Sequence, residues 1–260
     1  MQRLLSSLNA LFVTLVRTVK IPARAEKMTL FSLCLSAIAL FAFIEIAEDV
    51  VEGDTGSFDA AILLAFHGGN AQLNPIGPPW LEETMRDLTA LGSSSILLII
   101  IATTIGFLAL TRKWHAAWMV LWSIVSGIVL SLLMKLGFDR PRPDLVPHAT
   151  AVYTQSFPSG HAMLSAIVYL TLGALLARTQ AEVRVKIYLL CVAMLLTVTV
   201  GISRVYLGVH WPSDVLAGWA GGAGWALLCW VVMIWLQSKG RIEPPTATSG
   251  RSDQSSHIRQ

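Results

Sequence analysis

The sequence predicts an all-α fold, an integral membrane bundle of six transmembrane helices with short amphipathic helices in the first external loop. Hydrophobic residues make up 54% of the 260 residues and charged residues only 13%, and the mean hydropathy is +0.63. This composition is too apolar for an ordinary soluble domain. A helix needs about 20 mostly apolar residues to cross a bilayer. Six stretches approach that length: 28–47, 95–111, 115–134, 161–177, 187–203 and 213–235.

The lysines and arginines give this bundle a predicted orientation. When the loops are assigned alternately to the two sides, 14 of the 19 basic residues fall on the side of both termini. The opposite side has the other five: Arg86, Lys135, Arg140, Arg142 and Arg204. Because cytoplasmic loops carry the excess of basic residues, we expect both termini in the cytoplasm. Segments 135–160 and 204–214 then face outward together.

The chain divides into three predicted parts. Residues 1–27 form a cytoplasmic or interfacial segment, because apolar residues at helical spacing between 4 and 19 favour a helix lying on the membrane surface. A cleaved signal peptide is the alternative, although basic residues follow the apolar ones and argue against it. Residues 28–238 form the six-span domain. Residues 239–260 are polar and rich in Ser, Thr and Pro, which predicts a disordered cytoplasmic tail.

The first external loop, from 48 to 92, is acidic and too polar to span a membrane. Two short amphipathic helices are predicted in it, one over about 58–66 and one that starts at Pro79. A loop of this length is more often functional or packed at the interface than disordered. We therefore expect it to pack at the membrane surface and to rim the entrance to a site.

Residues 203–214 place charged groups between two apolar stretches. Arg204 closes one stretch, and Pro212 suits the first position of the next helix, so His210 lies just outside a helix N-terminus. Asp214 follows one turn later and can fix the tautomer of the imidazole, as a histidine nucleophile or base requires. Taken singly, these residues have simpler explanations: a snorkelling arginine, an interfacial histidine and a first-turn carboxylate.

A second chemical stretch covers residues 135–161. Lys135 ends the third span, and the segment Arg140-Pro-Arg142-Pro forces an extended chain. Arg140 alone is explained well enough as a basic residue of the interface. Ser159 precedes the fourth span as a natural N-cap, and the N–H groups after it form an anion site. Helix capping does not explain His161, which follows Gly160 directly.

Together these residues suit the binding and transfer of phosphate. Phosphoryl transfer places charge on three equatorial oxygens. Lys135, Arg142 and Arg204 can bind those oxygens together with the N–H groups near Ser159 and Gly160. The two histidines can then divide the tasks of nucleophile and of acid for the departing oxygen.

The chain resembles the type 2 phosphatidic acid phosphatase family, whose signature has three parts. Lys-x6-Arg-Pro is present from Lys135 to Pro143, and Pro-Ser-Gly-His ends at His161. Ser-Arg-x5-His-x3-Asp runs from Ser203 to Asp214. The resemblance covers about residues 95–235 in order and topology.

The resemblance implies a role for each signature residue. His210 would form a phosphohistidine, oriented by Asp214, and His161 would be the general acid. It also implies that no metal and no cofactor takes part, which agrees with the lack of an external Asp/Glu cluster within the motifs. The residues that would hold phosphate are Lys135, Arg142, Ser159, Gly160 and Arg204.

The expected function is hydrolysis of a lipid phosphate or lipid pyrophosphate, such as undecaprenyl pyrophosphate, phosphatidylglycerophosphate or phosphatidic acid. The expected partners are this lipid substrate and the bilayer, with no nucleic acid. By similarity to bacterial members, we expect the inner (cytoplasmic) membrane, with the site facing the periplasm or exterior. A lipid phosphotransferase with the same phosphohistidine is the first alternative, and an anion carrier that uses buried basic residues is the second. The sequence does not rank the candidate lipids.

Overall fold

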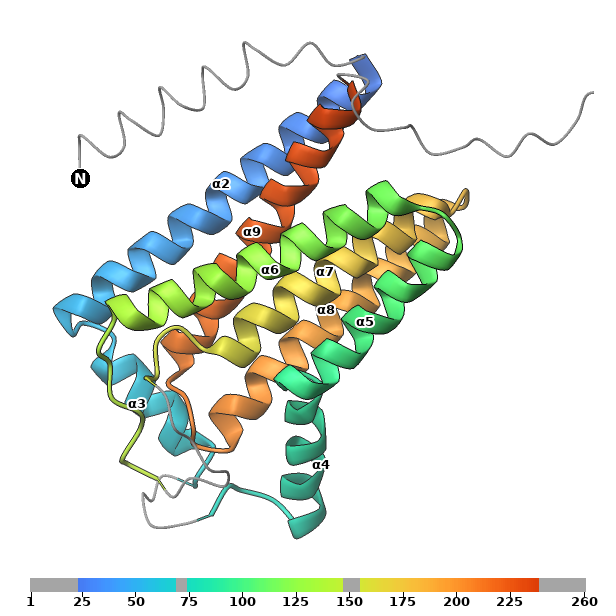
Figure 1. The fold of residues 1–260 in the computed structure, drawn as a ribbon. Helices are drawn as coiled ribbons and strands as arrows, with labels where there is room; N and C mark the ends of the chain where they lie inside the picture. Colours follow the sequence, from blue (N-terminus) through green and yellow to red (C-terminus); the bar gives the residue numbers. More distant parts are fainter. Residues whose placement is uncertain (1–22, 69–73, 147–154, 239–260) are drawn as a thin grey trace, which may run out of the picture.

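The computed structural model describes residues 23–68, 74–146 and 155–238. Within these ranges every regular element is a helix (Figure 1). The predicted all-α class is therefore confirmed. The predicted surface helix over 4–19 and the predicted disordered tail over 239–260 lie outside the described residues.

Among the described residues, five helices are long and apolar enough to cross a membrane. They are α2 (Ala23–Glu52), α6 (Trp114–Gly137), α7 (Gly160–Thr179), α8 (Val183–Tyr206) and α9 (Pro212–Ser238). The remaining predicted span corresponds to α5 (Ser94–Leu110), which joins α4 (Pro79–Ala90) through a bend of 45°. Counted as one broken span, this pair is the sixth. The chain is thus a multi-pass membrane protein.

The first span is longer than predicted. The apolar stretch ends at residue 47, but α2 continues as a helix through Glu48 and Asp49 to Glu52. These acidic residues end the hydrophobic pattern without ending the helix, since carboxylates are tolerated in exposed helical turns. The loop after this span therefore begins at Gly53, whose φ of +86° is a conformation that favours glycine.

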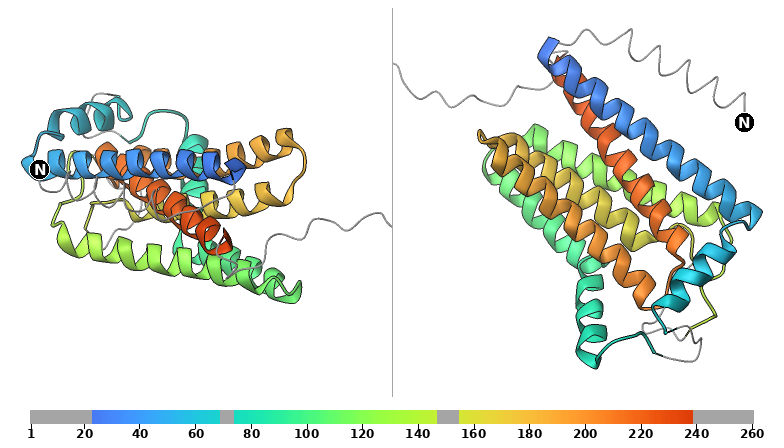
Figure 2. Two further views of the ribbon diagram at one scale, coloured as in Figure 1. Left: turned by 90° about the horizontal axis from the view of Figure 1, so that it is seen from above. Right: turned by 180° about the vertical axis from the view of Figure 1, so that it is seen from behind.

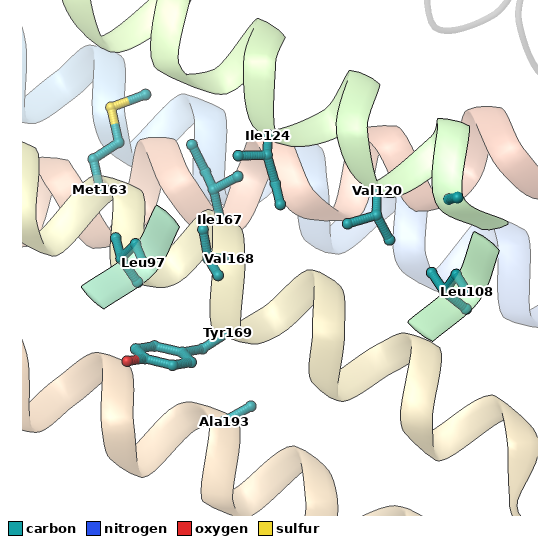
Figure 3. Packing of buried hydrophobic residues seen from close by; sticks show 10 residues of the cluster. Leu97, Leu108, Val120, Ile124, Met163, Ile167, Val168, Tyr169 and Ala193 are labelled. Atoms are coloured by element: carbon teal, nitrogen blue, oxygen red, sulfur yellow. The ribbon is translucent and has the colours of Figure 1, made fainter. Parts of the chain in front are cut away.

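Helix α7 lies inside the bundle and packs against α6, α8 and α9 (Figures 1 and 2). Its buried residues Met163 and Ile167 belong to one hydrophobic cluster with Val120 and Ile124 of α6 (Figure 3). Leu97 of α5 belongs to the same cluster. Outward faces of the bundle remain apolar, as lipid contact requires. Examples are Phe31, Leu98, Ile99, Trp118, Trp122, Leu132 and Leu133, all well exposed.

Glycines of α9 let two neighbouring helices approach its backbone. A Cβ added at Gly218 would lie 2.8 Å from the carbonyl oxygen of Ser159, and one at Gly222 would lie 2.5 Å from that of Met163. On another side, the Ser36 hydroxyl of α2 donates to the carbonyl of Gly224 over 2.9 Å. Small residues permit such approaches between membrane helices. They fix the starts of α7 and α9 side by side.

The two ends of the bundle differ. The start of α2 and the end of α9 lie together at one end (Figures 1 and 2). The other end carries the end of α8, the starts of α7 and α9, and the helices of the first loop, α3 (Gly56–Ala65) and α4. These helices lie where the two short loop helices were predicted; α4 is amphipathic as predicted, whereas α3 is an apolar helix. All the stretches that carry the signature residues meet at this end.

Candidate active site

The turn between α8 and α9 buries the predicted nucleophile. Gly208 has a φ of +70°, which lets the chain reverse after α8. His210 follows with an exposed fraction of 1%, and Asp214 is fully buried in the first turn of α9. His210 Nδ1 lies 3.4 Å from Asp214 Oδ2. The spacing of four residues thus brings the carboxylate beside the imidazole, as predicted.

Four donors surround the Asp214 carboxylate. Oδ2 accepts hydrogen bonds from the Ser156 hydroxyl and from the Trp211 backbone N–H, the latter over 3.0 Å, and it faces His210 Nδ1. Oδ1 accepts a charge-assisted bond of 2.5 Å from Arg140 Nη1. Donors of this kind favour the ionised carboxylate, and this carboxylate assigns the imidazole proton to Nδ1.

The second ring nitrogen of His210 faces Arg142. Arg142 Nη1 lies 3.2 Å from His210 Nε2 and donates to the Val209 carbonyl over 2.6 Å. With the proton on Nδ1, the lone pair of Nε2 points toward the guanidinium. An anion that bound Arg142 and displaced this contact would therefore lie next to the lone pair of His210 Nε2.

Burial keeps the His210 imidazole neutral. Desolvation lowers the pKa of His210 to about 4, although the bond to Asp214 and its charge act in the opposite direction. Burial also lowers the pKa of Arg142, again opposed by Asp214. A neutral imidazole beside guanidinium groups is the state that a nucleophile needs.

Lys135 reaches over the start of α7. It lies in the last turn of α6, and its Nζ donates to the Gln155 carbonyl over 2.8 Å. A Cβ at Gly160 would lie 3.4 Å from Lys135 Cε, so the lysine side chain passes directly over this glycine. The ammonium group and the first N–H groups of α7 therefore border the same space.

Ser159 occupies the predicted N-cap position but does not cap with its side chain. Its carbonyl accepts from the Met163 N–H over 2.9 Å, as an N-cap residue should, and its own N–H donates to the Asp214 carbonyl. The hydroxyl, however, bonds none of the first N–H groups of α7. Ser159 Oγ is buried and has no partner among the described residues. The predicted N-cap position is confirmed, but the side chain makes no capping bond, so this hydroxyl is a spare donor at the site.

Arg204 and His161 meet the bend between α4 and α5. Arg204 is 5% exposed, and its Nη1 donates to the Thr89 hydroxyl over 3.2 Å. Half-buried His161 packs against Gly92, where an added Cβ would lie 3.4 Å from the histidine Cβ and Cδ2 atoms. His161 interacts electrostatically with Arg204, Arg142, Lys135 and His210. The signature residues thus gather at one site, and the first external loop forms one of its walls.

Arg140 belongs to the site, contrary to its prediction as a basic interface residue. Its side chain is only 15% exposed and forms ion pairs with Asp214 and with Asp59 of α3. Sequence reasoning missed Arg140, Asp59, Ser156 and Thr89. The only signal for them is the alternation of Arg140 and Arg142 with proline, since Asp59 is one of eight acidic residues in its loop.

No group of three or more His, Cys, Asp or Glu side chains that could hold a metal occurs in the described part of the chain. The carboxylates of the site are occupied by arginine, serine and backbone donors. The expectation of a metal-free reaction remains a prediction.

The chain is similar to known membrane phosphatases. The profile of the PAP2 superfamily matches residues 116–238. Phosphatidylglycerophosphatase B of Bacillus subtilis (strain 168) is 38% identical over 155 residues, which cover 56% of this chain and 72% of that protein. The undecaprenyl-diphosphatase of Sulfolobus acidocaldarius is 36% identical over 99 residues, 38% of this chain and 42% of that protein. The crystal structure of a transmembrane PAP2 type phosphatidylglycerolphosphate phosphatase from Bacillus subtilis superposes with a TM-score of 0.65 and 30% identity, covering 79% of this chain and 94% of that one.

Proposed function

The chain belongs to the PAP2 superfamily, and we propose that it is a membrane enzyme that hydrolyses a lipid phosphate or lipid pyrophosphate. One observation carries the proposal. The Nδ1 side of His210 faces Asp214, while Nε2 lies 3.2 Å from the Arg142 guanidinium. The names of the relatives support a lipid substrate.

In the first step, His210 Nε2 attacks the phosphorus atom. Lys135, Arg142, Arg204 and the N–H groups at the start of α7 hold the phosphoryl oxygens and balance the charge that develops on them. The bond from phosphorus to the lipid oxygen breaks, and His161 gives that oxygen its proton. His210 becomes positively charged as it forms the phosphohistidine, and Asp214 stabilises this charge.

In the second step, water attacks the phosphohistidine. His161, now without its proton, takes one from the water molecule, and the bond from phosphorus to Nε2 breaks. Inorganic phosphate leaves, and both histidines return to their starting states. A phosphotransferase would differ only here, because an alcohol acceptor would replace the water.

The proposed placement is a bacterial inner membrane, with both termini in the cytoplasm and the site on the periplasmic or outer side. The positive-inside rule supports it, because the site end of the bundle carries the smaller share of basic residues. A site at the membrane surface receives the phosphate of a lipid whose chains stay in the bilayer. Water for the second step comes from the same side.

Phosphate release by the purified protein tests this function. Phosphatidylglycerophosphate, phosphatidic acid, undecaprenyl pyrophosphate and a lipid A phosphate are supplied in detergent micelles, and inorganic phosphate and the lipid product are both measured. We expect release from at least one lipid, no release by His210→Ala, inhibition by vanadate, and full activity in EDTA. Release from none of them would overturn the proposal. Loss in EDTA that magnesium restores would reveal a metal site, and transfer of phosphate to an added alcohol in place of release would identify a phosphotransferase.

A further inference from the structure

We propose that Asp59 and Arg140 are positioning residues for the Asp214–His210 pair, and that α3 of the external loop thereby supplies a charge that the reaction needs. This inference rests on the proposed function. It assigns the Asp59 carboxylate the task of holding half of the Arg140 guanidinium away from Asp214. Asp214 then keeps enough negative charge to stabilise His210 when it becomes cationic.

The Arg140 guanidinium is divided between two carboxylates. Nη1 donates to Asp214 Oδ1 over 2.5 Å and to the Ser213 hydroxyl over 2.8 Å. Nη2 donates to Asp59 Oδ2 over 2.7 Å and to the Thr55 hydroxyl over 3.0 Å. The planar guanidinium can bridge two acceptors in this way, whereas a lysine ammonium presents a single point charge.

Asp59 is placed as firmly as Arg140. It is fully buried, its Oδ1 accepts from the Ser213 backbone N–H over 2.8 Å, and its Oδ2 accepts from the Ser213 hydroxyl over 2.6 Å. A carboxylate of α3 therefore binds the first turn of α9, the turn that carries Asp214. A buried carboxylate with this many donors holds its partners in place.

The charges of this network bear on the transition state. If Asp59 lost its charge, the Arg140 cation would rest on Asp214 alone. Asp214 would then stabilise the cationic His210 less, because more of its charge would be neutralised by the arginine. Phosphate binding would change little, since Asp59 and Arg140 do not face Nε2 of His210. The loss should thus appear in kcat and not in KM.

Asp59→Asn tests this directly, because the amide keeps an oxygen for the Ser213 N–H but removes the charge and the Oδ2 acceptor that holds Arg140 Nη2 and the Ser213 hydroxyl. We expect kcat to fall about tenfold, a usual size for coupling within one polar network, with KM unchanged. The matched control is Asp54→Asn, an exposed acid of the same loop, which should match the wild type. In an Arg140→Met background, Asp59→Asn should cost nothing further, because no guanidinium remains to be held.

The pH profile separates electrostatic positioning from simple loosening of the loop. His210 is faced by Asp214 of α9, Arg142 of the loop before α7, Arg204 of α8 and His161 of α7, and the variants change none of these. Weaker support from Asp214 should lower the pKa of His210 further and move the acid limb of kcat/KM to lower pH. Loosening would admit water and raise the pKa, because burial is what lowers it. The second ionisation of the substrate is the same in every profile.

Several outcomes would overturn the inference. They are a wild-type kcat for Asp59→Asn, an acid limb that moves to higher pH, or a tenfold loss that persists in the Arg140→Met background. If Asp59→Asn does not fold, Arg140→Lys decides, because it keeps the charge but cannot bridge both carboxylates. Wild-type kcat in that variant would refute the role. A wild type that releases no phosphate would instead refute the proposed function.

Discussion

Gly218→Ala should push apart the two helix starts that form the site. Gly218 lies one turn after Asp214, and a Cβ there would meet the Ser159 oxygen at 2.8 Å, the Ala162 Cβ at 3.0 Å and the Met163 nitrogen at 3.1 Å. Two of these three atoms belong to the backbone of the first turn of α7 and cannot rotate away. Ordinary contacts begin at 3.4 Å, so α7 has to withdraw by the difference, about 0.6 Å, if contacts of normal length are to return.

The size of the effect follows from this displacement. Overpacking a tight contact costs about 1–3 kcal/mol, and the better helix propensity of alanine offsets up to about 1 kcal/mol of that. For catalysis, a misplacement of 1 Å can cost about 100-fold. A shift of about 0.6 Å between Ser159 and Asp214 should then lower kcat/KM roughly tenfold, if the logarithm of the loss is proportional to the displacement.

The assay compares Gly218→Ala with Gly106→Ala. Gly106 is exposed on α5, and a Cβ there would meet nothing within 4 Å. Phosphate release gives kcat/KM, and tryptophan fluorescence in detergent gives Tm. We expect the control to keep wild-type kcat/KM with an equal or higher Tm. Full activity and an unchanged Tm in Gly218→Ala would refute the close approach of α7 to α9 and the geometry built on it.

Three further predictions address the chemistry, the topology and the pH dependence. His161→Ala should lose most activity on a lipid monoester, by about 100- to 10,000-fold, but proportionately less on an aryl phosphate, whose leaving group needs no proton; His210→Ala should be inactive on both, and an unchanged ratio of the two kcat/KM values in His161→Ala would show that the roles are wrong. In a background without native cysteines, cysteines at Lys113 and Glu182 should label only from the cytoplasm and one at Asp144 only from outside, and the reverse pattern would invert the orientation. The pKa of His210 is about 4 in the folded protein and about 6.5 in the unfolded chain, so between these values the unfolded chain binds the extra proton and the free energy of unfolding falls as the pH falls. From pH 6.5 to 5 the wild type should lose about 2 kcal/mol more than His210→Gln. Equal losses in a series of Tm measurements would contradict the buried neutral imidazole.

Most of this fold can be predicted from the sequence, because apolar stretches and helix-start residues, which define membrane spans, are local sequence patterns. Pro212 and Ser159 lie next to the starts of α9 and α7, so turn chemistry and the apolar stretches locate both helices almost to the residue. The end of α2 was less predictable, since Glu48 and Asp49 interrupt hydropathy but not hydrogen bonding. The bend between α4 and α5 depends on packing against α8, which local sequence does not encode.

The candidate site likewise contains contacts that the sequence predicts and contacts that it does not. His210 and Asp214 are four residues apart, and one helical turn suffices to predict their meeting. Arg140 meets Asp59 across 81 residues, and Arg204 meets Thr89 across 115. Nothing in the neighbourhood of Asp59 distinguishes it from the other acids of its loop. Such contacts form only when the helices pack against one another, so a single sequence cannot identify them.

The wall that Asp59, Thr89 and Gly92 contribute comes from a part of the chain separate from the signature. All eight predicted catalytic and phosphate-holding residues lie between Lys135 and Asp214, inside the region that the family profile matches. The first external loop lies before that region, yet it touches Arg140, Arg204 and His161. This wall of the site can therefore vary in sequence independently of the signature residues. Substitutions in the described part of this loop can change the surroundings of Arg204 and His161 while every signature residue stays the same.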